Sequence, residues 1–267
     1  MHDHQDATDV AAEPHRVDLP SVDLLGNEAH APARSIAAAR ALARMGIGGV
    51  AAAAVAIGLL HVVAPSSSLD PLSSTISEYA LLADGWIFNG AVMLLAVSSA
   101  LVVTALILRE IVPLQSWGAV LTFVWCVGLM GLIIYPKQRM GIDPSFLGRV
   151  HWTWTLIAFF SLPIGACLMC WQHRGPAGRW PGWAVRLSMI AGGWFGVLTA
   201  QTALSALTPV QAWRAVGFVE RALSLTEMVV VVSLALWVLD DSRPDLLPVR
   251  SSPVEAAARG ETFRQPG

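Results

Sequence analysis

The chain has 267 residues, of which 55% are hydrophobic and only 13% are charged. Soluble domains carry about 25% charged residues, so this composition excludes an ordinary soluble protein. The formal net charge is −2 and the basic residues form no stripe, which excludes a nucleic-acid-binding surface. All three cysteines lie inside apolar runs, so we expect no disulfide framework.

Six long apolar runs account for the low charge, and each is long enough to cross a bilayer as a helix. In chain order, the predicted spans cover residues 45–64, 86–108, 115–135, 149–171, 183–207 and 217–239. We therefore predict an all-α fold, a polytopic integral membrane protein whose bundle of six transmembrane helices occupies residues 44–239. We predict that the protein lies in the cell (plasma) membrane, where its partner is the lipid bilayer.

Polar segments flank this predicted bundle at both ends. Residues 1–43 and 240–267 are rich in charged residues, Ala and Pro, a composition typical of disordered tails. Residues 36–44 resemble a helical lead-in to the first span. If both tails are cytoplasmic, twelve of the 17 Lys and Arg residues fall on the cytoplasmic side and five on the outer side. This bias predicts that both termini are cytoplasmic.

The first predicted outer loop, residues 65–85, contains three acidic residues and no Lys or Arg. Thr75 and Glu78 have the spacing of a capping box, which marks the start of a helix. The residues that follow place an apolar face on a helix over 75–83: Ile76, Tyr79, Ala80 and Ala83. We predict a short interfacial helix here with Ser77 and Glu78 facing water or a partner. A capped connector without chemistry is an equally consistent interpretation.

Polar residues within the spans gather in their predicted outer halves. Glu220, Ser224 and Glu227 share one face of the sixth span, and Gln201 and Ser205 share a face of the fifth. We predict a polar cavity that opens outward among the first, fourth, fifth and sixth helices. The candidate ligand-binding residues are His61, Asp70, Ser77, Glu78, His151, Gln201, Glu220, Arg221 and Glu227.

Glu227 is the most informative of these residues because of its depth. It lies ten residues into its span, which at 1.5 Å per residue is roughly 15 Å, near the middle of the bilayer. A charged carboxylate facing lipid there costs at least about 2.5 kcal/mol. We expect its side chain to face the bundle and to be protonated or paired, with His61 as the first partner to test. Hydrogen bonding between helices without a substrate is the alternative.

A hydrolytic metal site is a second possibility. His61 and His151 are the histidines on the predicted outer side, with four carboxylates available nearby: Glu78, Asp143, Glu220 and Glu227. Two histidines and one carboxylate form a known zinc set. The chain has no HExxH motif, no GxSxG motif and no cofactor motif. We therefore predict no metal and no cofactor, and assign no catalytic residue.

The sequence also resembles a known family. His61, Asp70-Pro71-Leu72 and Ile76-Ser77-Glu78 match the pattern of the bacterial six-span proteins grouped as domain of unknown function 998 (DUF998). Two further matches are Gly148-x-x-His151 and Gly217-Phe218-Val219-Glu220-Arg221. The family usually has Phe-Pro-x-Asp after the third span, where this chain has Tyr135-Pro136-Lys137-Gln138 and an acid only at Asp143. The resemblance covers about residues 44–239 and implies six helices.

Two classes of function are consistent with these observations. The first is a membrane protein that binds, senses or moves a lipid or another small-molecule ligand in the outward-facing cavity. The second is an intramembrane hydrolase or lipid-modifying enzyme that uses His61, His151 and carboxylates. An enzyme should lose its activity when one residue among His61, Glu78 or His151 is replaced.

Overall fold

The computed structural model describes residues 22–138, 145–173, 178–207 and 215–240. Within this part of the chain the fold is all-helical, without a strand, as the sequence predicts. Its α-helices are α1 (Val22–Leu60), α2 (Gly85–Leu108), α3 (Trp117–Ile134), α4 (Phe146–Cys170), α5 (Arg179–Leu207) and α6 (Val216–Leu239). Three short 3₁₀-helices accompany them: η1 (Ser66–Ser68), η2 (Ile76–Leu81) and η3 (Trp171–His173).

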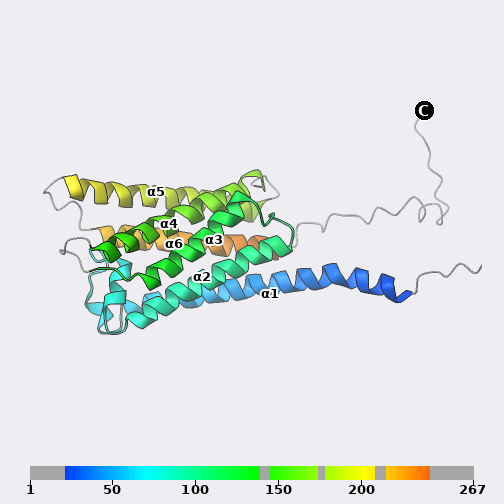
Figure 1. Ribbon diagram of the computed structural model, residues 1–267, viewed down its shortest axis with the longest axis horizontal. Coiled ribbons are helices and arrows are strands. Elements are labelled where there is room, and N and C mark those ends of the chain that lie inside the picture. Colours follow the sequence, from blue (N-terminus) through cyan, green and yellow to red (C-terminus); the bar gives the residue numbers. More distant parts are fainter. Residues whose placement is uncertain (1–21, 139–144, 174–177, 208–214, 241–267) are drawn as a thin grey trace, which may run out of the picture.

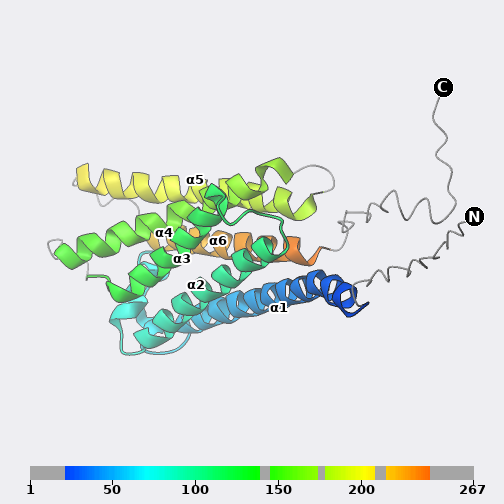
Figure 2. The same ribbon diagram turned by 45° about the vertical axis from the view of Figure 1, so that its right-hand side comes forward.

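All six α-helices are long and apolar enough to cross a membrane, so the chain is a multi-pass integral membrane protein. They run roughly along one axis, and α6 packs against α1, α2, α4 and α5 (Figures 1 and 2). In contrast, α5 packs mainly on α4 and α6, at the outside of the bundle. The start of α1 and the end of α6 lie at the same end of the bundle, and η1 and η2 lie at the other (Figure 1).

Helix α1 extends further toward the N-terminus than its hydropathy predicts. It begins at Val22, so residues 22–43, which we assigned to a tail, are helical, and Ala39 and Ala43 are fully buried. Alanine is the strongest helix former, which explains the early start. Close packing on α2 explains the burial, since a Cβ atom added at Gly49 would lie 2.0 Å from Ser98 Oγ. The remainder of both predicted tails, and Asp143, lie outside the described residues.

The first span ends at Leu60 instead of residue 64, and residues 61–84 fold over the end of the bundle. We call residues 61–84 the cover. Its predicted helix is present but is the six-residue 3₁₀-helix η2, in which Ile76 and Tyr79 are buried. Ala83 is exposed, contrary to the α-helical face we predicted. With three residues per turn, a 3₁₀-helix aligns positions 76 and 79. η2 ends at Leu81, so Ala83 lies outside it.

Candidate functional site

Arg221 on α6 holds the cover in place. Its Nη1 donates to the backbone carbonyl oxygens of Pro71 at 2.9 Å and Ser74 at 2.7 Å. Its Nη2 donates to the hydroxyl of Tyr79 at 3.1 Å, and its guanidinium lies 5.6 Å from the centre of that ring. Its Nε donates to Nε2 of His61 at 2.8 Å. One side chain therefore joins α6 to the start of the cover at His61, to its turn at residues 71–74 and to η2.

These contacts define the state of His61. Arginine can only donate, so His61 Nε2 must be the acceptor. The other ring nitrogen, Nδ1, lies 2.9 Å from the carbonyl oxygen of Ile57 and must therefore carry the proton. Both ring nitrogens of His61 are thus in use, and its ring packs edge-on against Tyr79 with centroids 5.4 Å apart. Its ring nitrogens contact Arg221 and Ile57, so His61, which we named as the first partner of Glu227 to test, is engaged elsewhere.

Asp70 shapes the turn that Arg221 binds. Its Oδ1 accepts a hydrogen bond from the backbone N–H of Leu72 at 3.1 Å, and its Oδ2 accepts one from the Ser73 hydroxyl at 2.6 Å. The Ser73 bond, followed by the Leu72 bond, lowers the pKa of Asp70 below its usual value. The side chain is exposed, so Asp70 is a residue that organises the cover and does not reach into the bundle.

Gly217 lets the cover approach α6 closely. A Cβ atom at this position would lie 2.2 Å from the carbonyl oxygen of Ser74 and 2.6 Å from that of Pro71. Its backbone N–H also donates to the carbonyl oxygen of Leu72 at 2.9 Å. The Gly217–Arg221 segment, which the family resemblance singled out, is therefore the docking surface for the Asp70–Leu72 turn.

Glu78 fastens the cover to the end of α3 through Lys137. The Lys137 ammonium lies 2.9 Å from Glu78 Oε1 and also donates to the Thr75 hydroxyl. Thr75 and Glu78 form the predicted capping box. Burial acts to raise the pKa of Glu78, but the hydrogen bond and charge of Lys137 and the bonds from Thr75 outweigh it, so the pKa is lowered.

This lowered pKa predicts how the stability of the protein depends on pH. Glu78 should contribute stability above its pKa in the unfolded chain, and this contribution should be lost as the pH falls through its lower pKa in the folded protein. We expect Glu78→Gln to reduce the free energy of unfolding by about 0.5–1 kcal/mol at pH 7, as for other partly exposed ion pairs.

Urea unfolding in mixed micelles from neutral to acidic pH measures this difference, and it should shrink toward zero in acid. Glu110→Gln is the matched control, because Glu110 is an exposed glutamate at the opposite end of α2. A difference between wild type and Glu78→Gln that is constant across this pH range would contradict the pairing.

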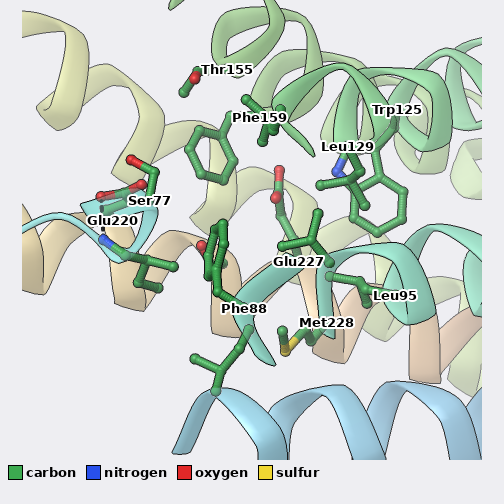
Figure 3. Close-up of a pocket in the computed structure, with 15 residues that line it drawn as sticks. Ser77, Phe88, Leu95, Trp125, Leu129, Thr155, Phe159, Glu220, Glu227 and Met228 are labelled. Carbon is green, nitrogen blue, oxygen red and sulfur yellow. Dashed lines mark hydrogen bonds between the residues drawn. The ribbon is translucent and has the colours of Figure 1, made fainter. Parts of the chain in front are cut away.

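Beneath the cover, a cavity extends into the bundle between η2 and helices α1, α2, α3, α4 and α6 (Figure 3). Most of its lining is apolar, and five polar residues also line it: Ser77, Thr155, Glu220, Ser224 and Glu227. The space open to the centres of water molecules is about 50 Å³, whereas one ordered water needs roughly 10–15 Å³. The cavity therefore has room for several waters or for one small molecule.

Two buried glutamates line this cavity at different depths. Glu220 is 6% exposed, and its Oε2 accepts a hydrogen bond from the backbone N–H of Ile76 at 2.9 Å, which ties it to the cover. Glu227 lies two turns deeper on the same face and is 2% exposed. Within the described part of the chain, its Oε1 has no hydrogen-bond partner, and neither does the indole Nε1 of Trp125. Figure 3 shows that indole nitrogen on the side facing the Glu227 carboxylate.

The structure does not bring all the predicted site residues together. His151 is buried in α4 and its Nδ1 donates to the carbonyl oxygen of Tyr135 at 2.7 Å. Gln201 is buried in α5. Neither residue is among the described residues that line the cavity. We expected α5 to form part of the cavity wall, but α2 and α3 form it instead. Since α5 packs on α4 and α6 at the outside of the bundle, its polar face cannot reach the cavity.

The histidines do not form the zinc set considered above. His61 uses both ring nitrogens with Arg221 and Ile57, while His151 is held by the chain end of α3. Among the described residues, no group of three or more His, Cys, Asp or Glu side chains is arranged to hold a metal ion.

Three contributors to the site were not predicted: Lys137, Tyr79 and Trp125. Lys137 had a usable signal, because it is a cation that follows a predicted span on the side where acids prevail. We assigned Tyr79 to the apolar face of the predicted helix, and nothing in the sequence indicated that its hydroxyl binds Arg221. Trp125 lies inside an apolar span, and only the three-dimensional structure shows that it lines the cavity.

Comparison with known proteins identifies a matching protein family. The family model described as "Protein of unknown function (DUF998)" matches residues 30–237, which is well over half of the chain. No curated protein and no solved structure matches this chain. The matched range contains the whole cover, the cavity and every residue of the site discussed above.

Proposed function

The chain belongs to the DUF998 family, and we propose that this member binds a small solute or part of a lipid in the cavity beneath its cover, reached from the outer face of the membrane. The observation that carries the proposal is Glu227, a carboxyl group buried at mid-bilayer depth that lines a cavity and has an oxygen without a partner among the described residues. Ionisable residues inside a membrane are costly, and their default interpretation is functional.

The form of the cavity supports binding. Ligand sites are mostly apolar concavities with a few convergent polar groups that fix the orientation of the ligand. Here the polar groups come from α4, α6 and η2, and the apolar walls come from α1, α2 and α3. The cover closes the outer end of the cavity through single side chains, so its release would admit a ligand without unfolding the bundle.

The contacts of the histidines favour binding over hydrolysis. A hydrolase that used His61 as a general base would need a ring nitrogen free to take a proton. Both nitrogens of His61 are in use, and they position Arg221 against the cover. We therefore propose a protein that binds, senses or moves its ligand, and assign His61 a positioning role.

Chemical modification of an introduced cysteine tests the proposal. Ser224 lines the cavity, whereas Ser233 is buried farther along α6 and is not among the lining residues described. We expect Ser224→Cys in purified full-length protein to react with iodoacetamide, a small uncharged reagent, much faster than Ser233→Cys. The wild-type protein measures the background from its three native cysteines. Equal and slow reaction at both positions would mean that small solutes do not enter the cavity.

A further inference from the structure

The charges around Glu227 indicate what kind of ligand the cavity takes. Two of the residues that line the cavity are acidic and, among the described residues, none is a Lys, Arg or His. Two cations of the described chain lie near the cover, and both are bound to other groups. Lys137 is bound to Glu78 and Thr75, and Arg221 is bound to the carbonyl groups of the cover, to Tyr79 and to His61. Glu227 therefore has no counter-charge from the cavity wall.

From this geometry we propose that the ligand of the cavity is a small organic ammonium ion with an apolar body, whose charged group binds Glu227. This inference rests on the proposed binding function and gives the chemical class of the ligand. A cation bound there would supply the charge that the wall lacks. It would also offer hydrogen-bond donors to Glu227 Oε1, the oxygen that has no partner among the described residues.

The aromatic side chains favour an ammonium over a neutral polar group. Phe88, Phe159 and Trp125 all line the cavity, and in Figure 3 the Glu227 carboxylate lies between the ring of Phe159 and the indole of Trp125. The face of an aromatic ring attracts a cation, and this attraction strengthens away from water. An anion is disfavoured because it would face two acidic side chains.

The apolar lining disfavours a bare metal ion. Hard cations such as Ca²⁺ and Mg²⁺ require six or more oxygen ligands, and such ions are held by clusters of carboxylates, carbonyls and waters. Around Glu227 the neighbours that line the cavity are mainly Leu95, Leu129, Phe159 and Met228. An alkylammonium satisfies both features, because its charged end needs few partners and its alkyl body is compatible with the apolar wall.

The test compares two molecules of nearly the same shape, isobutylammonium and isobutanol, binding to the purified full-length protein in buffer without other amines. Titration calorimetry gives both affinities, with sodium chloride as the control for ionic strength. We expect isobutylammonium to bind wild type at least about tenfold more tightly than isobutanol. Glu227→Gln should weaken ammonium binding by about 10–100-fold, as for the loss of a hydrogen bond to a charged group, and leave isobutanol unchanged. Glu110→Gln, at the opposite end of α2, should change neither affinity.

A second measurement keeps the proposal testable if Glu227→Gln does not fold. Isobutylammonium should slow the reaction of Ser224→Cys with iodoacetamide, and isobutanol at the same concentration should not. Equal affinity for the two molecules, equal protection by them, or ammonium binding that Glu227→Gln leaves intact would each overturn the proposal. The proposed binding function is judged separately, by whether Ser224→Cys reacts faster than Ser233→Cys without any ligand.

Discussion

Replacement of Arg221 by methionine is expected to lower the free energy of unfolding by about 3–6 kcal/mol. The guanidinium donates to two carbonyl groups of the cover, to Tyr79 and to His61. Each hydrogen bond to a charged group contributes about 1.5–3 kcal/mol, and water will satisfy part of what the variant exposes, so we take the loss as that of two such bonds. The cover should then detach while the bundle remains folded.

Arg221→Lys should recover only a small part of this loss, because an ammonium is a compact donor and cannot span the separate acceptors that the planar guanidinium reaches. Hydrogen exchange along residues 66–82 should show where protection is lost, and urea unfolding in mixed micelles should give its size. Arg44→Met, at an exposed arginine of α1, is the matched control. A change within about 0.5 kcal/mol for Arg221→Met, the range of ordinary surface substitutions, would contradict the role given to Arg221.

The helices and the acidic face of α6 could be predicted from the sequence because each depends on residues close together in the chain. Apolar runs of the right length identify spans, and the spacing of Glu220, Ser224 and Glu227 places them on one face of one helix. That face does line the cavity. The periodicity of one helix does not indicate which other helices pack around its polar face. The prediction that α5 lines the cavity was therefore wrong, and the contributions of α2 and α3 were not predicted.

The contacts of the cover could not be predicted for a related reason. Arg221 and His61 are separated by 160 residues and Glu78 and Lys137 by 59, so no local pattern pairs them. The family motif grouped most of these residues, but a motif records residue types and does not distinguish a ligand contact from a structural one. Asp70 illustrates this, because it matches the motif and yet only shapes an exposed turn.

The side of the membrane on which the cover lies decides where a ligand enters. The cover lies at one end of the six-helix bundle, and the start of α1 and the end of α6 lie at the other. The excess of Lys and Arg predicts that both termini are cytoplasmic. Two of the five cations on the cover side have structural partners there, since Lys137 pairs with Glu78 and Arg221 binds the cover. We therefore propose that the cover, and with it the cavity entrance, faces outward.

Labelling of intact cells with a membrane-impermeant maleimide tests this central claim most directly. Ser67 is exposed in the cover and Glu110 is exposed at the opposite end of the bundle, so a cysteine at either position is accessible from its own side only. The native cysteines, measured in wild type, set the background. We predict that Ser67→Cys is labelled in intact cells and Glu110→Cys only after lysis; labelling of Glu110→Cys in intact cells, with Ser67→Cys labelled only after lysis, would contradict the outward-facing cavity.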